Sequence, residues 1–396
     1  EATKDYGHAW TTFANVEKSW AYRQDQLPST HPVAADMTDL ETVEANFDGI
    51  TYAKGASVLK QLVAYVGRDA FLSGMRAYFA EHAFGNADFD DLLAALETAS
   101  GRDLSGWADQ WLRTTGINPV SVEIATGRDP REIGELTVLQ GPAAPGAGEF
   151  RTHRLAVGLY NRDASGAIVR TARAEVDVSG ERTAVDQLAG HPVPDLALPN
   201  DDDLTYCSIR LDERSLATVV DSLEDISDPL ARTLCWSALW EMTRETRLPA
   251  RRFVDVVTRA APREAHIGVV QRVLTQAHTA LSRYADPDWA AATGWKTFSK
   301  AMLNAARDAE PGSDHQLAFL TALCACPIGF DQGRLLSTLL DAGADEAGLP
   351  GLVVDTDLRW TVLTALVASG AADTEHIESE LARDDTAGGA RRAATA

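Results

Sequence analysis

The stretch Asn46-Phe47-Asp48-Gly49-Ile50-Thr51-Tyr52-Ala53-Lys54-Gly55-Ala56 opens the clearest helical pattern in the chain. Beyond Tyr52, apolar residues recur at the spacing of one helical face, at Ala53, Ala56, Leu59, Val63 and Val66. Gly67 then supplies a helix stop, because glycine readily adopts the left-handed conformation found after many helices. The pattern predicts a helix over Tyr52–Val66 whose apolar stripe faces a core.

Helical patterns continue to residue 116. A helix is predicted over Asp69–Ala83, where Phe71, Leu72, Met75, Tyr78 and Phe79 form a stripe. Asp88 is predicted to cap a helix over Phe89–Ala99, since a carboxylate there accepts hydrogen bonds from free backbone N–H groups. A short amphipathic helix is expected around Trp107 and Trp111.

At Ile117-Asn118-Pro119 the period changes from helical to alternating. Val120, Val122 and Ile124 alternate with less apolar residues, which is typical of a half-buried strand. Further strands are predicted at Leu136–Leu139, Leu155–Tyr160, Ala167–Arg170, Glu175–Val178 and Leu204–Leu211. Several short strands separated by turn residues favour a small β-sandwich.

From Asp212 the helical period returns and persists, in segments such as Leu230–Thr243, Ala250–Ala260, Ile267–Ala280 and Leu358–Ala368. No strict repeat is visible in the sequence. We expect an array of helical repeats from the succession of helices, although no fixed period supports it. The fold class is therefore multidomain and mainly α with a small β-sandwich. We expect domains at 1–116, 117–211 and 212–396.

Composition limits the function classes. The 396 residues carry a net charge of −22, which argues against a nucleic-acid partner, because phosphate binding depends on a basic surface. No apolar run approaches the ~20 residues of a membrane helix. The four cysteines have no framework spacing, which fits a reducing cytoplasm, and Cys324 and Cys326 are expected as core thiols and not as metal ligands. The missing initiator Met and the unstopped last helix predict a piece of a longer polypeptide.

Self-sufficient catalytic motifs are absent from the sequence. None of the nine histidines is followed by Glu, so the zinc-protease helix H-E-x-x-H does not occur. Neither a G-x-S-x-G elbow nor a phosphate-binding glycine loop is present.

The opening stretch nevertheless resembles the F-x-x-I-x-Y-x-K-G-A segment of the aminopeptidase N family of zinc enzymes. Four other segments resemble that family in the same order: Ser29-Thr30-His31-Pro32, Phe71–Phe79, Asn86-Ala87 with Asp91-Leu92, and Trp107–Trp111 with Gly116 and Pro119. The resemblance implies the helical end of a thermolysin-like catalytic domain, followed by a β-sandwich and a helical array. It also implies zinc-assisted removal of N-terminal amino acids from peptides.

The residue that matches the family's catalytic tyrosine is Tyr52, whose hydroxyl would donate a hydrogen bond to the developing oxyanion. The zinc ligands, the proton-accepting Glu and the G-A-M-E-N segment of the family have no counterpart here, and Glu1 lacks the surroundings of a zinc ligand. The expectation is therefore that this chain binds no metal, is inactive alone and needs an N-terminal half that carries the zinc site.

Other residues have a functional and a structural reading. Arg359 could meet a peptide carboxylate or form a structural salt bridge, and the second reading is favoured. His31 is read as a turn residue, and Lys54 and Gly55 as packing and backbone fit. The carboxylates of Asp201-Asp202-Asp203 are expected in a solvated loop and not at a metal.

Two alternative functions stay open. The chain could be a non-catalytic relative whose helical array binds peptides or protein partners. It could also be a structural helical-repeat protein that resembles the family by chance.

Overall fold

The computed structural model describes residues 7–36 and 38–396, so Glu1 lies outside the described residues. Contacts divide the chain into two compact units, Glu1–Glu241 and Met242–Ala396. This division differs from the three expected domains, because the first helices and the strands belong to one unit. Its boundary falls within a helix and not at residue 211.

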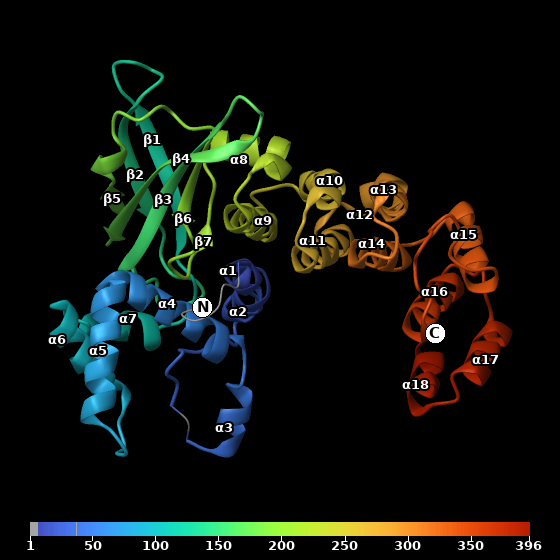
Figure 1. Ribbon diagram of the computed structural model, residues 1–396, viewed down its shortest axis with the longest axis horizontal. Helices are drawn as coiled ribbons and strands as arrows, with labels where there is room; N and C mark the ends of the chain where they lie inside the picture. Colours follow the sequence, from blue (N-terminus) through green and yellow to red (C-terminus); the bar gives the residue numbers. More distant parts are fainter. Residues whose placement is uncertain (1–6, 37) are drawn as a thin grey trace. The chain divides into compact units, whose positions relative to one another are not determined.

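The first unit begins with helices (Figure 1). They are α1 (Ala9–Thr12), α2 (Lys18–Asp25), α3 (Leu40–Ala45), α4 (Gly55–Val66), α5 (Arg68–Glu81), α6 (Phe89–Ser100) and α7 (Ser105–Leu112), with π-helical turns η1 (Phe13–Glu17) and η2 (Ile50–Lys54). The predicted cap at α6 is confirmed, because the Asp88 carboxylate accepts from the backbone N–H of Asp91 in a capping box. Gly101 ends α6 in the left-handed conformation, and Gly67 ends α4 with φ +86°.

The predicted apolar stripe of α4 is confirmed at its ends, where Ala53 and Val66 are buried, and is wrong at its centre. Leu59 is 47% exposed, whereas Val58 and Leu62 are buried. The buried face also contains Ser57 and Gln61. Polar residues occupy this face because it meets the strands, where the Gln61 side-chain amide donates to Thr152 O. The spacing of apolar residues alone does not identify a buried helix face that contains polar side chains.

The strands form two sheets, in agreement with a small sandwich. One sheet has the order β5-β2-β1-β7 and the other β4-β3-β6. Their bounds are β1 (Pro119–Thr126), β2 (Ile133–Gln140), β3 (His153–Arg162), β4 (Ile168–Val178), β5 (Arg182–Ala184), β6 (Leu196–Asp201) and β7 (Ser208–Ile209). The pairs are antiparallel, except that β7 runs parallel to β1. The alternation in β1 is confirmed, since Val120 and Val122 are buried.

Three strand predictions need correction. The two strands expected at Ala167–Arg170 and Glu175–Val178 are one strand, β4, because pairing with β3 continues through the polar residues between them. The strand expected over Leu204–Leu211 shrinks to β7. The sequence missed β6, whose residues are all buried although they end in Asn200 and Asp201.

Helices return with α8 (Glu213–Ser222) and α9 (Pro229–Arg244), which crosses into the second unit. The second unit contains α10 (Ala250–Ala260), α11 (Ile267–Thr279), α12 (Pro287–Trp289), α13 (Trp295–Asp308), α14 (Asp314–Cys324), α15 (Phe330–Asp341), α16 (Thr356–Ala368), α17 (Thr374–Arg383) and α18 (Ala387–Thr395). Successive helices pack on one another, as α10 on α11, α13 on α14 and α15 on α16 (Figure 1).

All four cysteine side chains are buried and free, which confirms the burial predicted for the Cys324 and Cys326 thiols. Burial raises the pKa of the Cys207, Cys324 and Cys326 thiols to about 12. Among the described helices, none has the length and apolar character needed to cross a membrane.

Candidate functional site

Tyr52 lies in the π-helical turn η2 at the start of α4. Its side chain is 49% exposed and makes an edge contact with Phe47, with ring centroids 4.9 Å apart. Within the described part of the chain, the phenol hydroxyl has no hydrogen-bond partner. A half-exposed, unpaired hydroxyl is free to donate to another molecule.

The turn that carries Tyr52 is held at its first residues. The Asp48 carboxylate accepts hydrogen bonds from the backbone N–H groups of Ile50 at 2.9 Å and Thr51 at 3.1 Å. The backbone N–H of Tyr52 donates to the Asp48 carbonyl at 3.1 Å. These bonds satisfy donors that the first turn of a helix leaves free, and they fix the direction in which Tyr52 leaves the backbone.

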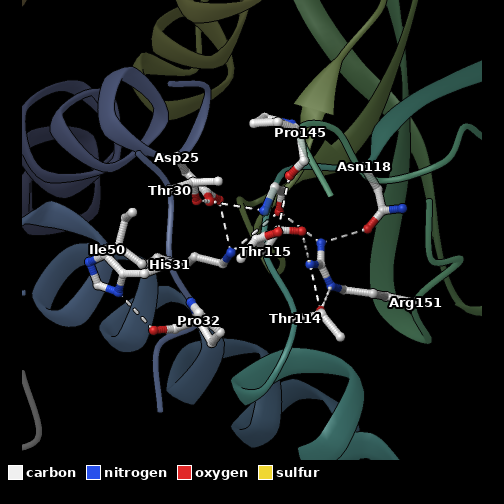
Figure 2. Close-up of polar contacts among 12 residues, drawn as sticks. Asp25, Thr30, His31, Pro32, Ile50, Thr114, Thr115, Asn118, Pro145 and Arg151 are labelled. Atoms are coloured by element: carbon white, nitrogen blue, oxygen red, sulfur yellow. Dashed lines mark hydrogen bonds and ion pairs between the residues drawn. The ribbon is translucent and has the colours of Figure 1, made fainter. Parts of the chain in front are cut away.

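His31 braces the same turn from the loop before α3. Its Nε2 lies 3.1 Å from Asp48 Oδ2, and its Nδ1 lies 2.8 Å from the Pro32 carbonyl oxygen. Figure 2 shows the His31 ring directed at Pro32. Both contacts lie within the protein, in agreement with a turn residue.

Lys54, two residues after Tyr52, is wholly buried. Its ammonium lies 2.8 Å from Asp25 Oδ2 and 3.3 Å from the Gly116 carbonyl oxygen. Burial lowers the pKa of Lys54 to about 8, although the nearby Asp25 carboxylate opposes this shift. The packing role predicted for Lys54 is therefore an ion pair inside the first unit. At Gly55 an added Cβ would lie 3.5 Å from Val33, an ordinary contact, so close packing does not require glycine there.

Arg151 is a residue that the sequence analysis missed. It is fully buried and donates to the carbonyl oxygens of Thr115 at 2.7 Å and Gly116 at 2.9 Å, and to Asn118 Oδ1 at 2.9 Å (Figure 2). The Gly116 N–H donates to Asp25, whose carboxylate also binds Lys54. One polar network thus ties the segment before β1 to the turn that carries Tyr52. Its members are far apart in sequence, so no local pattern identifies them.

A cavity of about 980 Å³ opens beside Tyr52, between α4, α6 and α7. The misassigned stripe of α4 lines it, since Ala56 and Leu59 face this space with Leu93 and Leu112. Trp107 also lines the cavity, and its buried Nε1 has no hydrogen-bond partner among the described residues. The volume lies within the usual range of ligand sites, and the walls are mainly apolar.

Arg359 is engaged inside the second unit. Its guanidinium donates to both oxygens of the Glu380 carboxylate at 2.7 Å each, and to Leu340 O at 3.1 Å. This is the structural salt bridge that the sequence analysis favoured. A contact of Arg359 with substrate stays a prediction. For that contact, the guanidinium would have to leave the Glu380 carboxylate and bind the carboxylate of a peptide.

The solvated loop expected at Asp201-Asp202-Asp203 is wrong. Asp201 accepts from the Tyr160 hydroxyl at 2.6 Å and pairs with Arg170 at 2.7 Å. Asp203 is fully buried and pairs with Lys18 of α2. The carboxylates are ion-paired because basic residues of β4 and α2 reach them through the fold.

Zinc does not fit the residues that the structure describes. Across residues 7–36 and 38–396, no group of three or more His, Cys, Asp or Glu side chains lies close enough to hold a metal ion. The described part of the chain thus presents a candidate hydrogen-bond donor, Tyr52, and no ligand set beside it.

Comparison with known proteins gives two family matches. Residues 196–396 match the ERAP1-like C-terminal domain, and residues 1–111 match the peptidase family M1 domain. Aminopeptidase N of Streptomyces lividans is 49% identical over 395 residues, which is 98% of this chain and 45% of that protein. Tricorn protease-interacting factor F2 of Thermoplasma volcanium is 38% identical over 120 residues, 30% of this chain and 15% of that protein. Probable aminopeptidase 2 of Sulfurisphaera tokodaii is 37% identical over 115 residues, 29% of this chain and 15% of that protein.

The chain thus spans less than half the length of these relatives. The two domain matches follow each other in the order that the sequence resemblance implied. The chain therefore belongs to the family of the ERAP1-like C-terminal domain, and it joins that domain to a stretch that matches the peptidase family M1 domain.

Proposed function

We propose that this chain is part of a zinc-dependent aminopeptidase that removes N-terminal amino acids from peptides. Tyr52 is its oxyanion donor, and the zinc ligands lie in another segment of the same polypeptide. The observation that carries the proposal is the unpaired, half-exposed hydroxyl of Tyr52 on a braced turn beside a large apolar cavity. The names of the relatives, several of them aminopeptidases, support the reaction class.

The chemistry assigned to Tyr52 follows from its neutral hydroxyl. During attack on a peptide carbonyl, negative charge grows on the oxygen, and a fixed O–H donor stabilises that charge more than it stabilises the substrate. The braced turn holds the donor in place before the reaction begins. Removal of one such donor typically lowers kcat by ~10²–10³.

An exposed apolar surface in the first unit supports the part of the proposal that concerns a partner segment. Among the residues that the structure describes, thirteen of the eighteen exposed large apolar side chains lie from Trp10 to Phe89, including Leu40, Phe47 and Phe79. Apolar patches of this kind mark surfaces that bind another protein segment. We assign this surface to the zinc-carrying segment, whose docking would bring the ligands towards Tyr52.

The experiment complements this chain with the unmatched portion of the Streptomyces lividans aminopeptidase N. The wild-type assembly is compared with Tyr52→Phe, and Tyr78→Phe in α5 is the matched control. We expect Tyr52→Phe to lower kcat by ~10²–10³ with zinc content and KM nearly unchanged, and the control to retain activity. Full activity in Tyr52→Phe would refute the role of the hydroxyl.

The alternative is a non-catalytic relative that binds peptides through its helical array. A cavity of about 890 Å³ in the second unit, lined by Trp295, Trp360 and Ile328, favours this reading. An assembly that binds zinc and peptide but does not turn over would support it.

A cytoplasmic location, suggested by four free buried thiols, is part of the proposal and is tested by cell fractionation.

A further inference from the structure

Tyr206 is a side chain of the β-sandwich that reaches the core of the helices. It lies between β6 and β7 and is fully buried. The buried cluster that it joins contains Tyr22 of α2 and Ala53 of η2. Its ring packs on the ring of Tyr22, with centroids 4.8 Å apart. A residue of the sandwich is thus part of the core beneath the turn that carries Tyr52.

Two buried ammonium groups lie over the Tyr206 ring. Lys54 Nζ is 5.5 Å from the ring centroid, and Lys18 Nζ is 5.9 Å from it. Lys18 is 1% exposed and Lys54 is not exposed at all. A cation within about 6 Å of a ring centroid is attracted by the negative face of the ring, and more strongly where water is excluded. The Tyr206 ring therefore stabilises the Lys54 ammonium together with the Asp25 carboxylate.

The backbone on both sides of Tyr206 is bound to α2. The Lys18 ammonium donates to the carbonyl oxygen of Thr205 at 2.9 Å. The Tyr22 hydroxyl donates to the carbonyl oxygen of Cys207 at 2.8 Å. Because both neighbours of Tyr206 are held by one helix, the position of its ring over that core is fixed.

The segment that leads to Tyr206 has an unusual backbone. Asn200, Asp202 and Asp203 have φ angles of +58°, +63° and +57°, in the left-handed region that residues other than glycine seldom occupy. Such conformations cost free energy and persist where surrounding contacts hold them. The buried ion pair of Asp203 with Lys18 is one such contact. The contacts that place Tyr206 thus also maintain a strained turn.

Lys54 connects Tyr206 to Tyr52. Lys54 and Tyr52 are two positions apart in η2, and side chains at this spacing in a helix do not face each other. Lys54 is fully buried, whereas Tyr52 is 49% exposed. Because both side chains leave one short turn, the position at which Lys54 is held sets the direction in which Tyr52 leaves it.

We propose that Tyr206 is a positioning residue for Tyr52, which acts through the contact of its ring with the Lys54 ammonium. The β-sandwich is then a support of the candidate site and not only a connection between helices. The proposal rests on the proposed function for the role of Tyr52 in catalysis. Its structural part, a ring that holds Lys54 and η2 in place, is tested on this chain alone.

The first experiment detects the contact without catalysis. Protons over the face of an aromatic ring resonate at lower frequency, so NMR of carbon-13-labelled lysine side chains reports the ring, and Lys54→Met identifies the Lys54 signals. We expect the Lys54 Cε protons to resonate at lower frequency than those of the exposed Lys300 and to move towards them in Tyr206→Leu. Hydrogen exchange at the η2 amides should accelerate in the same variant. Lys54 signals without this shift would overturn the proposal.

Tyr160→Leu is the matched control. Tyr160 is also a fully buried tyrosine of the sandwich, but it lies in β3 and its hydroxyl donates to Asp201. This change should destabilise the first unit as Tyr206→Leu does, and leave the Lys54 signals and the exchange of η2 unchanged. Equal effects of the two changes on η2 would show that Tyr206 acts through stability alone and would refute the positioning role.

The second experiment measures turnover in the assembled enzyme. Tyr206→Leu should lower kcat by about 10–10²-fold with little change in KM, because a small displacement of a catalytic group is costly. Tyr206→Phe keeps a ring over the ammonium groups and should stay within about threefold of the wild type. Tyr160→Leu should leave kcat nearly unchanged.

Wild-type kcat in Tyr206→Leu contradicts the proposal, while Tyr52→Phe can still support the proposed function. A loss in Tyr206→Phe as large as in Tyr206→Leu assigns the effect to the hydroxyl and also contradicts it. An assembly without turnover refutes the proposed function and not the contact, which the NMR and exchange results then decide.

Fluorinated phenylalanines at position 206 replace Tyr206→Leu if that variant does not fold. Fluorine weakens the negative face of the ring and changes its shape little, so the attraction of the ring for Lys54 decreases along the series. We expect kcat to fall with each added fluorine at constant KM. The same kcat along the whole series would refute the role of the ring.

Discussion

At the scale of single residues, the buried ion pair of Lys54 and Asp25 anchors the turn that carries Tyr52. Lys54 lies two positions after Tyr52 and is fully buried, yet its partner is 29 positions away in the sequence. The sequence motif around Tyr52 contains Lys54, but it does not predict that Asp25 is the partner of this lysine. The pair matters because a buried charge without its partner is costly.

Lys54→Met should therefore lower the free energy of unfolding of the first unit by about 3–5 kcal/mol, because Asp25 stays buried without its counter-ion. Urea denaturation, followed by tryptophan fluorescence, measures the loss. Asp25→Asn in the Lys54→Met background should restore a large part of it. Arg113→Met, which breaks an exposed pair with Asp109, is the control and should change stability by less than about 1 kcal/mol. Equal effects of the two single changes would contradict the assignment.

At the scale of elements, β3 begins with a histidine that the fold keeps neutral. His153 is fully buried, accepts or donates one bond with the Thr205 hydroxyl at 2.9 Å, and stacks edge-on against Trp111. Burial, together with the positive Arg151 nearby, lowers the pKa of His153 from 6.5 to about 3. Between these two pH values the unfolded chain binds a proton that the folded chain does not.

The sign follows directly, because stability falls as pH falls wherever the unfolded state binds more protons. The contribution of His153 is complete above pH 6.5 and is lost progressively down to about pH 3. The shift corresponds to a loss of about 5 kcal/mol. His153→Gln should make the pH dependence of unfolding in this window shallower, as measured by urea midpoints. An identical acid profile in the variant would rule out His153 as the source.

The contact between α5 and α6 depends on Gly74. A Cβ at this position would lie 2.8 Å from Leu96 Cδ2 and 3.1 Å from Ala95 O. Gly74→Ala should therefore destabilise the first unit by about 1–3 kcal/mol through overpacking. A Cβ at Gly106 in α7 would meet no described residue within 4 Å, so Gly106→Ala should stabilise the first unit by up to about 1 kcal/mol, because alanine favours helix. Thermal unfolding of the two variants should move in opposite directions, and a common direction would contradict this packing.

At the scale of the whole molecule, the exposed apolar surface of residues 10–89 supports the proposal that the first unit binds another segment. The chain alone should show no chelator-sensitive aminopeptidase turnover and no stoichiometric zinc by atomic emission. Joined to a zinc-carrying segment, it should gain both and lose binding of an apolar fluorescent dye. Chelator-sensitive turnover by the purified chain alone would contradict this assignment of roles.

Local features of the fold were predictable from the sequence. Three features were predicted from local sequence: the capped helix α6, the glycines that end helices, and the alternation in β1. Each depends on residues within a few positions of one another, so a short segment of sequence is enough to predict it. The motif around Tyr52 and its ordered neighbours indicated the family in the same way. The catalytic role of Tyr52 stays a prediction until the assembled enzyme is measured.

Only the tertiary structure decided which polar groups are buried together. In the structure, the buried face of α4 includes Ser57 and Gln61. Asp203 pairs with Lys18, and Arg151 donates to the segment before β1. Gln61, Asp203 and Arg151 tolerate burial because partners from distant parts of the chain bind their polar groups. Hydrophobic patterning cannot encode such partners, whereas caps, turns and strand alternation need only their neighbours.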